Sequence, residues 1–343
     1  MAFFIPPSAL QNQATSSLHS PPLQNKMTTS DVGIFKSTLL PSLGIYSTLS
    51  LATYLAAEAT DRVELKDWLW PSCQVLNAWW TAIGQPIHKH NTSLGTAWDA
   101  LPWTERVLLS CVTIWGTRLF ARIAARSLVR GKDDSRYEAA KKEPGFWKGA
   151  LMKLFLPEAA ILSVISLPFT VPFTVGGAGL ALEENVVNVV RAVGVAVFGM
   201  GFAMEVIADT QLGLHRQERT DLCRHGIWGV VRHPNYLGDT LVHCSFALLN
   251  MAGSFSPVVL LGPLANYLFL RGMGGDKQTE ASQEERYKSD DPHKYEQLQQ
   301  WRKEKNSFWP AMRDLVNPWA LAVAGCGFIA VVIEEGFRGA YDM

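Results

Sequence analysis

The sequence has no excess of charge of either sign. Its 31 Lys and Arg residues balance 31 Asp and Glu residues, and these four types make up only 18% of the chain. A neutral chain has no overall attraction for nucleic acid, so no nucleic-acid partner is predicted. The five cysteines form no CxxC or CxH spacing, and His293 has no partner at metal-ligand spacing. Neither a disulfide framework nor a metal site is therefore expected.

Charge is also absent from long stretches of the chain. Asp, Glu, Lys and Arg are missing from the runs between Lys36 and Glu58, Asp67 and Lys89, Glu158 and Glu183, Asp239 and Arg271, and Asp314 and Glu334. A helix needs about 20 apolar residues to cross a bilayer. The longest run is predicted to form two helices joined by the turn-prone segment 250–257. We therefore predict an all-α, polytopic membrane protein with about six or seven transmembrane helices, surrounded by membrane lipids.

The chain begins with a polar stretch that is rich in Ser, Gln and Pro. It lacks the basic region leading directly into an apolar run that is typical of a cleaved signal. We expect residues 1–33 to form a disordered tail and residues 34–343 to form a single membrane domain.

Three segments carry most of the basic residues: Arg118–Lys132, Gln211–His233 and Arg271–Arg313. Short loops rich in Lys and Arg stay in the cytosol. Placing all three there requires an even number of crossings between successive segments, and the apolar runs supply it. The opposite face would then carry the Gly176–Gly179 turn and the Lys89–Glu105 loop, which contains the glycosylation sequon Asn91-Thr92-Ser93.

The first basic segment places an arginine at every fourth position, which aligns the side chains along one helix face. We expect Arg118 and Arg122 to face the protein interior. Arg126 and Arg130 are expected to reach the lipid phosphates.

Two acids follow an apolar stretch at 192–204. Glu205 and Asp209 are one helical turn apart, so both carboxylates lie on one face of a helix that they are expected to close. Acids at the C-terminal end of a membrane helix oppose its dipole and are costly to bury. A functional role is therefore favoured for the two acids. The polar residues Gln211, His215 and Arg216 follow within two turns and are considered part of the same group.

The segment Arg232-His233-Pro234-Asn235-Tyr236 precedes another apolar run. Pro234 suits the first turn of a helix, so Asn235, Tyr236 and Asp239 would lie at its N-terminal end. Free backbone N–H groups together with Arg232 and His233 would form an anion site suited to phosphate.

These elements, in this order, resemble the C-terminal region of the steroid 5α-reductase-like membrane proteins, and more narrowly an uncharacterised branch that shares that domain. The resemblance covers roughly residues 107–313. It rests on Trp115–Leu119, Glu205–Gln211, Gly226–Trp228, Arg232–Asp239 and a charged helix with Glu285-Arg286-Tyr287. The Arg-His-Pro-Asn-Tyr element is shared with sterol C14/C7 reductases and isoprenylcysteine carboxyl methyltransferases.

The resemblance implies a cytosol-facing pocket for NADPH, with a lipophilic small-molecule substrate entering from the lipid. The residues predicted to bind the cofactor are Glu205, Asp209, Gln211, Arg216, Arg232, His233, Asn235, Asp239 and Arg286. Steroid-active members also place an acid and a tyrosine from their N-terminal half near the enone, and residues 1–106 contain no match to them. Asp239 stands where the family usually has Glu.

The expected function is NADPH-dependent reduction of an activated C=C bond in a sterol- or isoprenoid-like substrate, in the endoplasmic reticulum. Tyr236 or Tyr287 would donate the proton. Two alternatives stay open: an S-adenosylmethionine-dependent methyltransferase of the isoprenylcysteine type, and a non-catalytic membrane scaffold or lipid-binding protein. The sequence does not indicate an oligomeric state.

Overall fold

The computed structural model describes residues 33–174, 183–253 and 256–341, and these contain helices and turns but no strand. The predicted all-α class is confirmed for this part of the chain. Four helices are long and apolar enough to cross a membrane: Phe35–Thr60, Trp103–Arg130, Glu184–Glu218 and Pro318–Tyr341. Large apolar side chains such as Phe328, which is 71% exposed, cover the outer side of the last one. Such a surface suits lipid chains rather than water.

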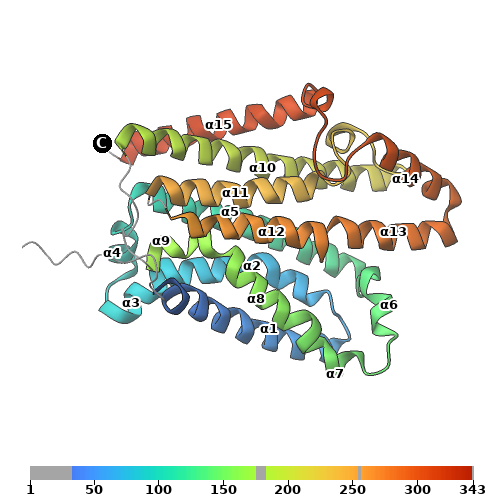
Figure 1. Ribbon diagram of the computed structural model, residues 1–343, viewed down its shortest axis with the longest axis horizontal. Coiled ribbons are helices and arrows are strands. Elements are labelled where there is room, and N and C mark those ends of the chain that lie inside the picture. The colour runs from blue at the N-terminus through green and yellow to red at the C-terminus, as the bar shows by residue number, and fades with distance from the viewer. Residues whose placement is uncertain (1–32, 175–182, 254–255, 342–343) are drawn as a thin grey trace, which may run out of the picture. The chain divides into compact units, whose positions relative to one another are not determined.

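The helices follow one another through short connections (Figure 1). In chain order the α-helices are α1 Leu40–Thr60, α2 Leu65–Trp79, α3 Gln85–His90, α4 Leu94–Asp99, α5 Trp103–Arg130, α6 Glu138–Lys141, α7 Phe146–Ala150, α8 Leu156–Ile165, α9 Val171–Thr174, α10 Glu184–Glu218, α11 Pro234–Gly253, α12 Leu261–Gly272, α13 Asp276–Asp290, α14 Pro292–Glu304 and α15 Pro318–Tyr341. The remaining helical elements are η2 Phe35–Leu39, η3 Trp80–Gly84, η4 Ser135–Tyr137, η5 Leu151–Phe155, η6 Leu167–Phe169, η7 Gly226–Gly229, η8 Pro257–Leu260 and η9 Met312–Asp314.

Several sequence predictions can be compared with these bounds. The run after Asp239 forms two helices, α11 and α12, and α11 begins at Pro234 as expected. The charged segment with Arg286 is also helical, in α13. The predicted tail, apart from Gly33, and the Gly176–Gly179 turn lie outside the described residues.

The position of the acid pair within its helix was predicted wrongly. Glu205 and Asp209 do not close a helix, because α10 continues to Glu218. The later turns are retained because Leu212 still packs against the core around Trp228. The two acids therefore lie in the interior of a long helix, where the helix dipole argument does not apply.

A close contact between glycines brings α10 against α11. A Cβ atom added to Gly201 would lie 2.7 Å from the carbonyl oxygen of Gly238, and one added to Gly238 would lie 2.9 Å from Cγ of Glu205. Only glycine permits this approach, which is typical of helix contacts in membranes. The contact places Glu205 on α10 beside the first turns of α11.

The three charged segments gather at one end of the bundle. Arg286 on α13 donates to Ser135 Oγ at 3.4 Å, and the backbone N–H of Leu222 donates to Gln297 Oε1 at 3.0 Å. Figure 1 shows α13, α14 and α6 at this end, and α3 and α4 at the other. The described parts of these segments therefore lie at one end of the bundle, and their cytosolic location stays a prediction.

Candidate functional site

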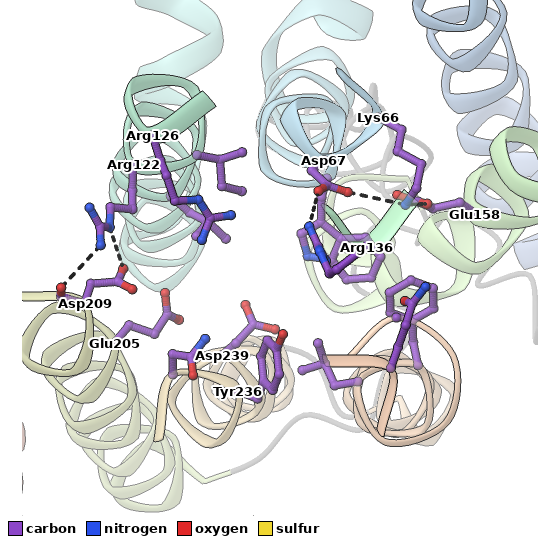
Figure 2. Close-up of a pocket in the computed structure, with 18 of the residues that line it drawn as sticks. Lys66, Asp67, Arg122, Arg126, Arg136, Glu158, Glu205, Asp209, Tyr236 and Asp239 are labelled. Carbon is purple, nitrogen blue, oxygen red and sulfur yellow. Dashed lines mark hydrogen bonds and ion pairs between the residues drawn. The ribbon is translucent and has the colours of Figure 1, made fainter. Parts of the chain in front are cut away.

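A cavity of about 180 Å³ lies at the charged end of the bundle. Glu205, Asp209 and Asp239 approach it from α10 and α11, while Asp67 and Arg136 approach it from the opposite side (Figure 2). The apolar part of its wall is formed by Trp70, Leu119, Ile123, Phe269 and Leu270. We call this the inner cavity. It combines an apolar wall with facing groups of charged side chains.

Arg118 bridges the acid pair on α10. Its Nη1 lies 3.0 Å from Glu205 Oε2, and its Nη2 pairs with Asp209. Trp115 Nε1 also donates to Glu205 at 3.2 Å, and Arg122 lies 3.5 Å from Asp209. The prediction that Arg118 faces the interior is confirmed. The acids therefore have cationic partners within the protein itself, and these come from α5 rather than from Arg216.

Two polar atoms in the inner cavity lack hydrogen-bond partners. Asp239 is only 6% exposed, and its Oδ2 accepts from Asn266 Nδ2 at 3.0 Å. Its Oδ1 and the Oδ1 of Asn235 are buried and accept no hydrogen bond from any described residue. Leaving such atoms unsatisfied costs about 1–3 kcal/mol each, so they indicate a place where a donor binds.

A second charged group faces the first across the inner cavity. Tyr137 donates its hydroxyl to Asp67 at 2.8 Å, and Arg136 pairs with the same carboxylate at 2.6 Å. Lys66 pairs with Glu158 at 2.8 Å. Burial, together with the negative charge of Asp67, raises the pKa of the Tyr137 hydroxyl above its usual range. Tyr137 is therefore a protonated phenol at neutral pH.

Sequence reasoning did not identify this second group. The available signal was weak, because Asp67 and Glu158 were noticed only as the ends of charge-free runs. Their convergence depends on the packing of α2 and α8 near η4, which no local pattern predicts.

A wider cavity of about 680 Å³ adjoins the inner one and shares Arg126, Arg136 and Tyr236 with it. We call it the outer cavity. Five arginines and two lysines line it, compared with four aspartates: Arg126, Arg130, Arg136, Arg216, Arg286, Lys132, Lys294, Asp133, Asp134, Asp290 and Asp291. Tyr287 lines this cavity but not the inner one. Its walls suit an anion with several negative charges.

The last two arginines of α5, Arg126 and Arg130, were predicted to reach lipid phosphates, but their contacts are with the protein and its cavities. Arg130 pairs with Glu64 and lies 2.7 Å from Asp134, because the turn after α5 folds back on the helix. Arg126 lines both cavities. The prediction that Arg130 reaches lipid phosphates is therefore wrong.

Three of the predicted cofactor residues lie outside both cavities. Arg232 and His233 each bond Glu280 at 2.9 Å, and Arg232 also donates to the backbone carbonyl of Lys305. Gln211 accepts from the backbone N–H of Ile227 at 2.9 Å. These contacts fasten the start of α11 and the η7 turn to neighbouring segments.

The remaining predicted residues lie at the cavities. Glu205, Asp209, Asn235 and Asp239 line the inner one, Arg216 and Arg286 line the outer one, and Tyr236 lies at their junction. Two elements of the sequence pattern therefore converge, the acids of α10 and the first turn of α11.

Comparison with known proteins identifies a family but no characterised relative. No curated protein and no solved structure matches the chain. A family described as "Protein of unknown function (DUF1295)" matches residues 53–301, a segment that contains every residue lining the two cavities. Because the match covers well over half of the sequence, the chain belongs to this family of unknown function.

Proposed function

We propose that the chain is an NADPH-dependent reductase of an activated C=C bond in a lipophilic, sterol- or isoprenoid-like substrate. The proposal rests on one observation: the inner and outer cavities adjoin, and their linings differ in polarity and charge. The inner one has an apolar wall and unpartnered acceptors, whereas the outer one is lined by seven cationic side chains and four carboxylates. The resemblance to steroid 5α-reductase-like proteins supports the same assignment.

The residues present fit this cofactor. The outer cavity of about 680 Å³ is within the roughly 300–1,000 Å³ typical of small-molecule sites, and its arginines would hold phosphate groups. In the inner cavity, the free oxygens of Asn235 and Asp239 would accept from an amide or hydroxyl donor of the cofactor. When bound, NADPH supplies a hydride to a conjugated C=C bond.

Two tyrosines border the inner cavity. Tyr137 lines the inner cavity, and Tyr236 lies at the junction, where its hydroxyl is 3.1 Å from Thr279 Oγ1. A protonated phenol can hydrogen-bond the oxygen of an enone as negative charge develops there. We assign this role to Tyr236, because the Tyr137 hydroxyl already donates its hydrogen to Asp67. Tyr287 lies beside Arg286 and Lys294 in the outer cavity, where it would contact the cofactor instead.

The two alternatives differ in what supports them. S-adenosylmethionine carries a sulfonium cation and no phosphate, so the excess of arginine and lysine in the outer cavity disfavours the methyltransferase. The non-catalytic scaffold is the second candidate, because Arg118 satisfies Glu205 and Asp209 without any ligand.

Thermal unfolding of the purified protein with NADPH, NADH or S-adenosylmethionine tests the assignment. We expect NADPH to raise the unfolding temperature most. Arg286→Ala should weaken NADPH binding by about 1.5–3 kcal/mol, the range for a hydrogen bond to a charged group. Arg313→Ala is the control, since Arg313 is 74% exposed and lies outside both cavities. A response to S-adenosylmethionine alone would favour the methyltransferase, and no response to any of the three would favour the scaffold.

We further propose that α2, α8, α11 and α12 also enter the bilayer, so that α8 and α10 form the pair of crossings between Arg126 and Arg224. With the four long helices this makes eight crossings, one more than the predicted six or seven, and we propose that the cavities face the cytosol from the endoplasmic reticulum. Cysteines placed at Arg126, Arg224 and Lys303 should then be labelled from the cytosolic side of sealed vesicles. Asn91 follows α3, which lies at the other end of the bundle, and its exposed side chain should be glycosylated or labelled from the lumen. Labelling of Arg224 and Lys303 from opposite sides would contradict the α11–α12 hairpin.

A further inference from the structure

An apolar groove of about 820 Å³ lies between α1 and the end of α2, where α2 continues into η3. Its first wall, on α1, consists of Pro41, Gly44, Ile45, Thr48 and Leu49. Its second wall, on α2 and η3, consists of Leu76, Trp79, Trp80, Ile83 and Gly84. In both walls the residues follow the first at three, four, seven and eight positions, so each wall is one face of a helix. We call this the α1–α2 groove, and its lining shares no residue with the inner or outer cavity.

The α1–α2 groove is preformed. On the buried side of the two helices, Asn77 Nδ2 donates to Ser42 Oγ at 3.0 Å and to the Tyr46 hydroxyl at 3.2 Å, which fixes α1 against α2. On the open side, a Cβ atom added to Gly44 would meet no described neighbour within 4 Å. This glycine therefore leaves space between two helices that are held together on their other side.

The lining of the groove suits a hydrocarbon chain. The Thr48 hydroxyl donates to the carbonyl oxygen of Gly44 at 2.8 Å, and the Trp79 indole donates to Thr113 Oγ1 at 2.9 Å, so both polar groups already have partners. Leu76 is 55% exposed at the groove. The groove's volume is within the roughly 300–1,000 Å³ typical of small-molecule sites. A lipid chain fits such a lining, whereas a peptide would leave backbone groups unpaired in it.

Two exposed lysines lie beyond one end of the groove. Lys36 lies five residues before Pro41 and Lys89 lies five residues after Gly84, so about 7.5 Å of helix separates each lysine from the groove. Both lysines lie at the same end, because η2 and η3 each contact α9, and Figure 1 shows α3 and α9 there. Trp80, which is 44% exposed, is of the residue type enriched at the headgroup level of membranes. An apolar groove that ends at two cations matches a lipid with a phosphate headgroup.

We propose that the α1–α2 groove binds a bilayer phospholipid with a net negative headgroup. One acyl chain lies in the groove against Gly44, and the headgroup lies at Lys36 and Lys89. Because the groove is separate from both cavities, this site does not rest on the proposed reductase activity.

Native mass spectrometry of the full-length protein in detergent, titrated with phosphatidylinositol or phosphatidylcholine, tests the groove. Gly44→Leu should weaken the binding of both lipids about tenfold or more, the loss expected when about two methylene groups are kept out of the groove. Gly44→Ala, which fills less of it, should give a smaller loss and serves if Gly44→Leu does not fold. Gly325→Leu is the matched control, because Gly325 is an exposed glycine of α15 that also has no described neighbour within 4 Å of an added Cβ atom.

The same titrations test the headgroup. The parent should prefer phosphatidylinositol, and Lys36→Gln and Lys89→Gln should each weaken its binding about fivefold, while phosphatidylcholine changes little. Lys277→Gln, an exposed lysine on α13, is the control. Equal phosphatidylinositol affinity in the parent and both Gly44 variants would overturn the proposal. Equal affinity of the parent for the two lipids would overturn the headgroup assignment, and displacement of phosphatidylinositol by cholesterol would make a sterol the occupant instead.

Discussion

Replacing Arg118 with leucine is expected to lower the free energy of unfolding by about 3–5 kcal/mol, the cost of removing one partner from a buried ion pair. Glu205 is only 2% exposed, and Arg118 is a partner of both Glu205 and Asp209. Without the guanidinium, two carboxylates one helical turn apart would lie at the inner cavity with less counter-charge. Denaturant or thermal unfolding in detergent measures the loss.

Two further variants make this test specific. Arg126→Leu alters an exposed arginine two turns along the same helix and should change stability little. Adding Glu205→Gln to Arg118→Leu should restore part of the lost stability, because one of the unpaired charges is removed. A loss below about 1 kcal/mol in Arg118→Leu would mean that the pair behaves like a surface ion pair.

Stability is also expected to fall when the pH is lowered, through Glu280 and His233. Burial alone would raise the pKa of Glu280, but hydrogen bonds from His233 and Arg232 lower it from 4.5 to about 2. The unfolded chain therefore takes up this proton first, and the stabilisation present above pH 4.5 is lost between about pH 4.5 and 2. Burial also lowers the pKa of His233 from 6.5, so its contribution begins to be lost as the pH falls below about 6.5.

Glu280→Gln should remove the lower part of this pH dependence and cost about 1.5–3 kcal/mol at neutral pH. Glu284→Gln is the matched control on the same helix. Glu284 is 39% exposed, pairs with Arg302 at 2.7 Å and accepts from Gln299 at 3.3 Å, so its loss should cost under about 1 kcal/mol. Unfolding measured across the acid range compares the two variants. Identical pH profiles for Glu280→Gln and the parent would contradict the assignment.

The Glu280 contacts also alter what an Arg232→Ala result would mean. Because Arg232 bonds Glu280 and the carbonyl of Lys305, its loss should first reduce stability. A direct effect on NADPH affinity is expected instead from Arg286, which lines the outer cavity. Arg118 and Arg122 already pair with Asp209, so Asp209→Asn is expected to change stability as well as any ligand binding. Asp239, whose Oδ1 lacks a partner, is the more informative acid.

Local features of the chain were predictable because their causes are local. A charge-free run of spanning length predicts a membrane helix, since lipid excludes charge and leaves backbone groups to bond within the helix. Pro234 begins α11, because its ring suits the first turn of a helix. The loop charges likewise predicted that the three charged segments lie together.

Partner choice was decided only by tertiary packing. Arg118 and Asp209 are 91 residues apart, and Asp67 and Tyr137 are 70 apart. Whether an arginine meets an acid, a lipid or a ligand depends on how closely its helix approaches the next one. The contact between Gly201 and Gly238 sets that approach for α10 and α11. Spacing along one helix shows which side chains share a face, but it does not show what lies opposite that face. The acids of α10 and the first turn of α11 were therefore predictable, while their partners and the facing group around Asp67 were not.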